Sequence, residues 1–367
     1  MDSNLPRKTV LIIDYMNFDS CAEIPYLFSQ AGCEVTILCD NKSWLTSGSF
    51  FRTQIVLSSK DPELFAQQVV DSINKGNYDH VCLVDDVAIR ILNEYIIDTQ
   101  LALKILPISK LDNRKFLGSK IEFSQFCKDN NFVTPEFEIY QGERHIDFPL
   151  LLKVDQSQGG KGVFYCDNEL SFNTIVKPGM VIQKYIKGDL IGIEAYFHQG
   201  KLIASACSLV LKNVGGEFSI SSQRLYYRNS ELEGVVSKFG EMLGAHGFAS
   251  ISFVQEQGTG KYFIFEFDSR TNAWLRLARY VGVDFSKAIQ LVETQQIVQE
   301  VVLRQFPRDF IRVLAKKDLQ GFTGWLFNRD SQWRMVPWYD IKLVYSIITR
   351  AITSGIIKLW KRYFGSI

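Results

Sequence analysis

The sequence predicts a chain of mixed α/β and α+β class, in which a parallel sheet precedes antiparallel strands and a helical C-terminal extension. Residues 8–108 alternate between strand and helix signals, and residues 149–267 contain apolar strands joined by glycine-containing turns. Residues 340–367 repeat apolar positions at roughly helical spacing. At 367 residues the chain is too long for one hydrophobic core, so two or three domains are expected.

The composition is that of a folded soluble protein. Hydrophobic residues make up 46% and charged residues 22%, and the formal net charge of +1 gives no reason to expect a nucleic-acid partner. The seven cysteines are scattered, without a CxxC pair or a histidine cluster, which argues for a reducing compartment and against zinc or disulfides. The polar start and the lack of a long apolar run predict a cytoplasmic protein without a signal peptide.

Strands and helices alternate in the N-terminal part, which predicts a parallel sheet with helices on both faces. The expected strands are Val10–Ile13, Glu34–Cys39, Gln54–Leu57, His80–Val84 and Lys104–Ile108. Helices are expected at Ile24–Gln30, after the cap Asp61-Pro62-Glu63, and from about Val87. The first turn lacks GxGxxG, so dinucleotide binding has no support. Asp85-Asp86 follows a strand end where such sheets bind ligands, although a solvated turn also explains the pair.

Residues 149–165 predict two strands joined by a glycine-containing loop. The loop contains Gly159, Gly160, Lys161 and Gly162, and Lys153 lies inside the first apolar strand. Glycines let backbone N–H groups approach an anion, and a lysine adds a point charge, so the pattern fits phosphate binding. A flexible hairpin turn is the alternative. A helical segment with Lys120 near its start precedes this region at Gly118–Asn131.

Further strands and one helix follow. The segment Met180–Phe197 contains a strand, a polar break at Lys187-Gly188-Asp189 and a second strand that carries Glu194. A helix is expected across Ser230–Leu243, followed by a hairpin of Phe248–Val254 with Lys261–Phe267.

The stretch Lys261–Arg270 concentrates charge on a strand. Two-residue alternation places Phe263, Phe265, Phe267 and Ser269 on one, buried face and Tyr262, Ile264, Glu266, Asp268 and Arg270 on the other. Charges on a buried strand are costly unless something pairs them. They fit either a structural ion-pair set or a divalent metal held by the carboxylates beside a phosphate-binding arginine.

Taken in order, Lys120, Lys153, the glycine loop, residues 183–186 and Glu266-x-Asp268-x-Arg270 resemble the motifs of the ATP-grasp superfamily. The closest likeness is to the ATP-binding domains of carbamoyl phosphate synthetase large subunits and biotin carboxylase. The resemblance covers roughly residues 1–290. It implies a Rossmann-like domain before the ATP-grasp domain at 1–110, an ATP-grasp domain at 111–305 with lobes at about 111–185 and 186–305, and an extension at 306–367.

The resemblance also implies ATP-binding roles. Lys120 and Lys153 would contact the phosphates, and the loop with Gly159, Gly160, Lys161 and Gly162 would fold over them. The connection between the lobes would be Gln183, Lys184, Tyr185 and Ile186, with backbone groups of Lys184 and Ile186 framing the adenine. Asp189 lies one residue out of register with the family's ribose-binding acid, and Glu194 matches a less regular acidic position.

For catalysis, the resemblance implies that Glu266 and Asp268 bind Mg²⁺, which Mn²⁺ could replace, and that Arg270 neutralises the transferring phosphoryl group. Asp268 stands where the family usually has Asn. The family's other metal ligand should lie on the partner strand, where Ser252 is a weak ligand and Glu256 is the fallback. Members of the family phosphorylate a carboxylate with ATP and let an amine or another nucleophile displace the phosphate.

The tail allows several interpretations. Residues 340–367 carry five basic side chains against one acid, Asp340, on a predicted amphipathic helix. Such a helix can lie on an anionic membrane surface or pack on its own domain or a dimer partner. The sequence thus predicts an ATP- and Mg²⁺-dependent carboxylate–amine ligase acting on small molecules. The alternatives are a nucleotide-binding regulatory or scaffold protein with reduced catalysis, and a membrane-surface adaptor that works through the tail.

Overall fold

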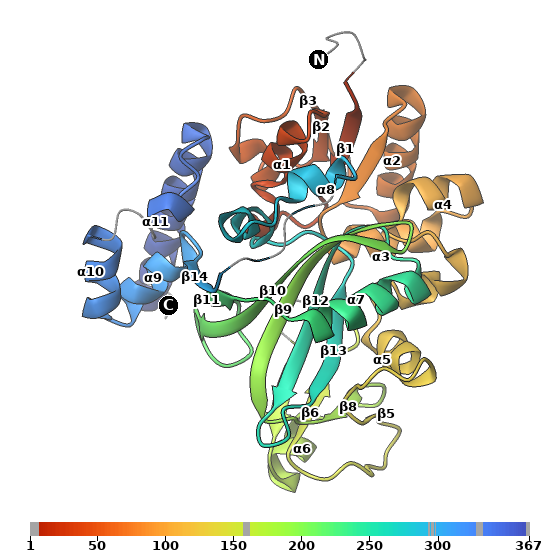
Figure 1. Ribbon diagram of the computed structural model, residues 1–367, viewed down its shortest axis with the longest axis vertical. Helices are drawn as coiled ribbons and strands as arrows, with labels where there is room; N and C mark the ends of the chain where they lie inside the picture. The colour runs from red at the N-terminus through yellow and green to blue at the C-terminus, as the bar shows by residue number, and fades with distance from the viewer. Residues whose placement is uncertain are drawn as a thin grey trace.

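The computed structural model describes residues 7–156, 162–292, 294, 297, 299–327 and 333–364, with side chains of the last helix described as far as Thr353. The described residues form a four-stranded, a six-stranded and a second four-stranded sheet. Figure 1 shows the N-terminal sheet at the top, the large sheet in the middle, the small sheet at the bottom and the C-terminal helices to one side.

The N-terminal sheet is parallel and has the strand order β3-β2-β1-β4. Its strands are β1 (Thr9–Ile13), β2 (Glu34–Cys39), β3 (Thr53–Val56) and β4 (His80–Leu83). The helical segments are η1 (Asp19–Cys21), α1 (Ile24–Gln30), η2 (Trp44–Ser47), α2 (Pro62–Gly76), α3 (Asp86–Tyr95), α4 (Thr99–Ile105) and η3 (Leu111–Phe116). Asp61 caps α2 by accepting from the backbone N–H groups of Glu63 and Leu64, which confirms the helix start expected there.

The strand expected at Lys104–Ile108 is wrong. Asp98 accepts a hydrogen bond from the Leu101 N–H at 2.8 Å and starts α4, which runs to Ile105. The residues that follow make a single bridge, between Ile108 and Ala245, and no ladder with the N-terminal sheet. An effective helix cap therefore overrides the short apolar run that suggested a strand.

The small sheet has the order β5-β8-β6-β7 and is antiparallel. Its strands are β5 (Phe137–Ile139), β6 (Leu150–Lys153), β7 (Val163–Cys166) and β8 (Val181–Lys184), and it is accompanied by α5 (Lys120–Asp129) and α6 (Glu169–Ile175). A compact apolar cluster that includes Leu152, Phe172 and Ile182 is formed by this sheet, α6 and adjoining loop residues such as Ile146. This part of the chain, here called the small lobe, therefore has its own core.

The large sheet is antiparallel, with the order β13-β12-β9-β10-β11-β14. Its strands are β9 (Gly188–His198), β10 (Lys201–Asn213), β11 (Ser221–Tyr226), β12 (Gly247–Glu256), β13 (Tyr262–Asp268) and β14 (Val301–Arg304). One face packs on α7 (Ser230–Leu243) and on helices of the N-terminal domain. Part of the other face packs on β1, β2, η4 (Leu275–Val281) and α8 (Phe285–Ile289). Two apolar clusters thus join the large sheet to the N-terminal domain.

Strand β13 does not alternate as the sequence suggested. Ser252 pairs with Glu266, but its neighbour Phe253 pairs with Ile264, so Phe265 is an extra residue in a β-bulge. The bulge turns Ile264 into the core, together with Phe267, while Phe263 moves to the other face. The predicted core face of Phe263, Phe265 and Phe267 is therefore wrong on the N-terminal side of the bulge, because one inserted residue reverses the alternation.

The C-terminal extension consists of α9 (Arg308–Ala315), α10 (Leu319–Phe327), η5 (Trp333–Met335) and α11 (Ile341–Phe364). Helix α11 buries Leu343 and Ile347 against the N-terminal domain, and Lys342 donates to the carbonyl of Gly48 at 3.0 Å. The described half of α11 therefore packs on its own chain. Ile341, Tyr345, Ile348 and Ile352 remain exposed, so a homodimer or membrane contact through this helix stays a prediction. None of the helices in the described ranges has both the length and the apolar character needed to cross a bilayer.

Candidate active site

Glu266 and Asp268 lie on the face of β13 that points away from α7. Their partners on β12 are Ser252 and Ser250, whereas Phe267 between them points into the core. Ser252 therefore stands directly beside Glu266, at the position where the resemblance leads one to expect a further metal ligand. Glu256 lies four residues farther along β12, roughly 13 Å away by strand geometry, and accepts from the Thr259 hydroxyl in the hairpin turn.

Arg270 joins this row of acids to the N-terminal domain. It donates to Asp268 at 3.0 Å through Nη2 and to Asp86, at the start of α3, at 2.6 Å through Nε. Burial raises the pKa of Asp268, and the Arg270 guanidinium opposes that shift. The ion-pair interpretation thus holds for Asp268 and Arg270 in this structure. Glu266, in contrast, forms no ion pair with any described residue.

The Asp85-Asp86 pair is not the solvated turn that its sequence suggested. Asp85 is buried, caps α3 by accepting from the Ala88 N–H at 2.8 Å, and accepts from the Tyr15 N–H at 2.7 Å. Burial raises its pKa to about 6. The neighbouring Asp86 holds Arg270, so this strand end of the N-terminal domain contributes to the group of charged side chains between the sheets, here called the cleft and defined by Lys120, Lys153, Glu266, Asp268 and Arg270.

Lys153 brings the small lobe to the same cleft. It ends β6, is only 6% exposed, and its Nζ lies 5.2 Å from the ring centroid of Phe265 on β13. Burial lowers its pKa to about 8, with Lys120 acting in the same direction and the charge of Glu266 opposing the shift. Lys120, at the start of α5, donates to the carbonyl of Asp155 at 2.9 Å. The structure thus places both predicted phosphate contacts within electrostatic range of the β13 acids.

Replacement of Lys153 by methionine is expected to stabilise the fold near neutral pH. A lysine whose pKa falls from 10.5 to about 8 on folding destabilises the folded state below pH 8, and this cost is lost as the pH rises toward 10.5. Lys153→Met should therefore raise the free energy of unfolding at pH 7 by up to about 3 kcal/mol. Urea unfolding at pH 7 and pH 10.5 measures the effect, and a gain that is equal at both pH values would contradict it.

The predicted loop is described only in part. Gly159, Gly160 and Lys161 lie outside the described residues. Gly162 is described, and its carbonyl accepts from the Val154 N–H at 2.8 Å at the base of the hairpin. Lys153 pairs with Val163, so the two strands expected in residues 149–165 are confirmed as β6 and β7.

The segment 183–186 runs from β8 of the small lobe toward β9 of the large sheet. Gln183 is buried, and the Lys184 N–H donates to the carbonyl of Glu136 at 2.8 Å. The Tyr185 N–H donates to the carbonyl of Pro149, and its hydroxyl donates to Glu217 at 2.8 Å. The backbone N–H groups of residues 184 and 185 are thus already hydrogen-bonded within the small lobe. The predicted adenine contacts would therefore have to come from other backbone groups of this segment, such as those of Ile186.

Asp189 and Glu194 occupy different environments on β9. Asp189 is exposed near the start of the strand, close to the connection between the lobes. Glu194 is completely buried and accepts from Arg224 at 2.7 Å and from Asn272 at 3.2 Å. The structure therefore does not present Glu194 as an open ligand beside the other predicted residues.

Sequence reasoning missed Arg224, which lies across the same face of the sheet. Its guanidinium covers Gly192, where an added Cβ would come within 2.7 Å of Nη1, and it stacks 4.7 Å from the Trp274 ring. Gly192 pairs with Ser252, the neighbour of Glu266. One signal could have identified Arg224. Like Lys153 in β6, it is a charged residue within a strand, two positions before the buried Tyr226, and such a charge needs a partner.

The parallel domain, the small lobe and the large sheet, with the cleft between them, make up the ATP-grasp fold. No family model and no curated protein matches the chain. Among solved structures it is similar to an L-amino acid ligase from Bacillus licheniformis, at 16% identity over 83% of this chain and 81% of that one, with a TM-score of 0.60.

Two further solved structures show the same likeness. N5-carboxyaminoimidazole synthetase from Staphylococcus aureus, complexed with ADP, matches 85% of this chain and 86% of its own at 11% identity, with a TM-score of 0.64. The biotin carboxylase domain of Hydrogenobacter thermophilus 2-oxoglutarate carboxylase, in complex with MgADP, matches 77% of this chain and 69% of its own at 13% identity, with a TM-score of 0.59.

Proposed function

We propose that the chain is an ATP-dependent ligase that activates a carboxylate as an acyl phosphate for attack by an amine or another nucleophile. The observation that carries the proposal is Lys153, a buried lysine of the small lobe that faces Glu266 across the cleft. A buried amine with a depressed pKa next to a carboxylate without an ion pair is costly for a purely structural site, and it suits a phosphate–metal ligand.

The donor set of the cleft fits Mg²⁺ or Mn²⁺. Glu266 and Asp268 offer carboxylate oxygens from the same face of β13, and these hard cations prefer oxygen ligands. Ser252 adds at most a hydroxyl. In the proposal Glu266 and Asp268 would hold the ion, which would supply positive charge next to the phosphates, and Asp268 would exchange its contact with Arg270 for the metal.

The chain's own residues would do the remaining work. Lys120 and Lys153 would bind ATP phosphates, and Arg270, oriented by Asp86, would offset the charge that develops when a carboxylate approaches the γ-phosphate. The segment 183–186 would hold the adenine and Asp189 the ribose. The loop at 158–162 would close over the phosphates and exclude water from the acyl phosphate.

The similar solved structures support the proposal that this chain uses ATP and small-molecule substrates. Two of them were determined with ADP or MgADP, and one is by its name an L-amino acid ligase. We propose a carboxylate and an amine as the substrate classes of this chain. We also propose that its domains divide near residues 110 and 305. The seven free, buried cysteines fit the proposed cytoplasmic location, because reducing compartments keep thiols unpaired.

A nucleotide-binding regulatory protein with reduced catalysis is the second candidate. The contact between Asp268 and Arg270 and the serine at position 252 favour it, since both weaken a metal site. Calorimetry with ATP in the presence and absence of Mg²⁺ separates the two. The ligase requires that Mg²⁺ tightens ATP binding, because the ion neutralises phosphate charge beside the acids. Equal affinity with and without Mg²⁺, and no hydrolysis with any acceptor, would favour the regulatory protein.

The variant Ser252→Asp sharpens this calorimetric test. An aspartate here would stand beside Glu266 and supply a further acidic ligand, so Mn²⁺ affinity in the presence of ADP should rise roughly tenfold. Electron paramagnetic resonance of bound Mn²⁺ measures it directly. Gln257→Asp, in the exposed turn that follows β12, is the control for added negative charge, and an equal rise in both variants would argue against a specific role for position 252.

A further inference from the structure

A second basic cavity lies outside the cleft, between the end of β10, the loop that leads to β11, and helix α9. Its volume is about 300 Å³, which is at the lower end of the range for small-molecule sites. Three cationic side chains line it, namely Lys212, Arg312 and Lys316, together with Gly215 and Gly216 of the loop. Nothing in the proposed ligase reaction uses these residues.

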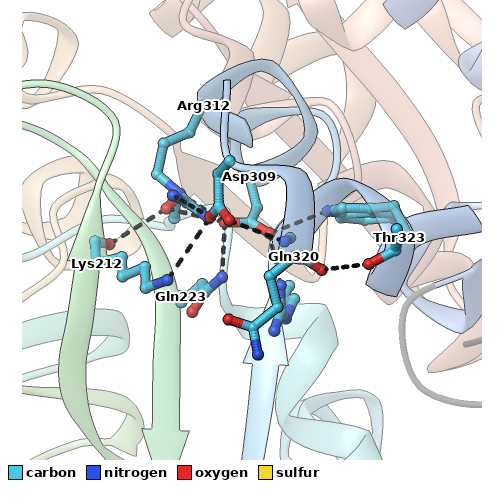
Figure 2. Close-up of polar contacts among 11 residues, drawn as sticks. Lys212, Gln223, Asp309, Arg312, Gln320 and Thr323 are labelled. Atoms are coloured by element: carbon cyan, nitrogen blue, oxygen red, sulfur yellow. Dashed lines mark hydrogen bonds and ion pairs between the residues drawn. The ribbon is translucent and has the colours of Figure 1, made fainter. Parts of the chain in front are cut away.

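Arg312 is the fixed element of this cavity. It is only 3% exposed, and it donates to Asp309 at 2.9 Å through Nε and to Asp318 at 3.3 Å through Nη1. Its Nη2 atom is buried and has no hydrogen-bond partner within the described ranges of the chain. Figure 2 shows Arg312 directed toward Asp309 on α9, with Lys212 on the neighbouring strand β10. A buried guanidinium donor without an acceptor is costly, so it points to a missing anionic partner.

Asp309 cannot supply that partner, because its two oxygens are already occupied. Oδ1 accepts from Gln223 at 3.0 Å and from Arg312, and Oδ2 accepts from the Trp325 indole at 3.0 Å. Arg304 lies 3.6 Å from Oδ2 as a second cation. The single buried carboxylate is thus shared between two guanidinium groups, and the region keeps an excess of positive charge.

The rest of the cavity adds to that excess. Lys212 and Lys316 are exposed, and Lys212 approaches Asp318 only to 3.9 Å. Glu217, the acid of the lining, is engaged by the Tyr185 hydroxyl. Glycines 215 and 216 let the loop backbone approach a bound group closely. Two mobile ammonium groups around a fixed guanidinium donor suit the several oxygens of a phosphate.

We propose that this cavity binds a phosphate-bearing small molecule, at a site separate from the nucleotide cleft. The site combines Arg312, fixed by Asp309 and Asp318, with Lys212 and Lys316, which close on the ligand from opposite walls. The inference does not depend on the proposed ligase activity, since none of these residues belongs to the cleft.

Calorimetric titration of the full chain with inorganic pyrophosphate, without Mg²⁺, tests the site. The double variant Lys212→Ala with Lys316→Ala should lower the affinity by about tenfold or more, because two charge-assisted contacts are lost. Both lysines are exposed, so the variant should fold. Arg312 is not replaced, because its loss would leave the buried Asp309 without its closest ion-pair partner. Lys201→Ala, an exposed lysine at the opposite end of β10, is the matched control and should bind as the unaltered chain does.

The variant Lys153→Ala distinguishes this cavity from the cleft. It removes a proposed phosphate contact of the cleft and should leave binding at the cavity intact. Loss of pyrophosphate binding in Lys153→Ala but not in the double variant would assign the anion to the cleft and overturn the inference. It is equally overturned if the unaltered chain does not bind pyrophosphate, or if Lys201→Ala weakens binding as much as the double variant does.

Discussion

Replacement of Glu266 or Lys153 by alanine is expected to abolish ATP-dependent ADP formation, with a fall of about a thousandfold. Of the two acids Glu266 and Asp268 on β13, Glu266 forms no ion pair with a described residue, and Lys153 of the small lobe faces it. Loss of either removes charge stabilisation that the γ-phosphate needs when a carboxylate approaches it. The measurement is a coupled assay for ADP over a panel of carboxylic acids and amines, with circular dichroism to show that the variants fold.

Glu256→Ala is the matched control for this prediction. The residue is an acid on the neighbouring strand, but it accepts from Thr259 in the hairpin turn and lies away from Glu266. ADP formation should persist in this variant, although the sequence alone made Glu256 a fallback ligand. Unchanged turnover in both Glu266→Ala and Lys153→Ala would rule out the ligase assignment. Loss of ADP formation in Glu256→Ala alone would indicate that the metal ligand on β12 is Glu256 and that the metal does not lie beside Glu266.

Local patterns predict the place of a residue in the fold where a single strand or turn determines it. Lys153 stood out because a lysine within an apolar strand needs a reason, and the structure buries it beside the acids of β13. Ser252, in contrast, was singled out by the resemblance, and its pairing with Glu266 depends on the bulge, because the register of Phe253 with Ile264 would otherwise place Ser252 opposite Phe265. Lys153 could therefore be predicted from its own strand, whereas the place of Ser252 beside Glu266 could not be obtained from strand geometry alone.

Features that arise from distant contacts or from one inserted residue could not be predicted in this way. The bulge at Phe265 could not be predicted from the sequence, because Phe263, Ile264 and Phe265 are all apolar and either face of the strand could be the buried one. The pair of Asp86 with Arg270 joins residues 184 positions apart, and no local signal distinguishes it from a solvated turn. Arg312 and its cavity depend likewise on the packing of α9 against β10 and β11.

Replacement of Asp309 by alanine should cause the largest loss of stability, about 3–5 kcal/mol. The carboxylate is completely buried and balances Arg312, which is itself buried, and the half-buried Arg304. Without it, Arg312 Nε and the Trp325 indole lose their acceptor and Arg304 loses its ion-pair partner, and each unpaired buried donor adds a desolvation cost. Urea unfolding followed by tryptophan fluorescence measures the loss, since Trp325 lies against this cluster.

Two further variants separate charge from hydrogen bonding in the Asp309 prediction. Asp309→Asn keeps an acceptor for the Trp325 indole but removes the negative charge, so its destabilisation should fall between that of alanine and the unaltered chain. Asp318→Ala removes the other acid that contacts Arg312, but this carboxylate lies at the surface, where such ion pairs contribute little to stability. If Asp309→Ala were no more destabilising than Asp318→Ala, the buried carboxylate would not be what holds the C-terminal extension to the large sheet. The hydrophobic contacts of Trp325 and Val313 would then have to carry that attachment.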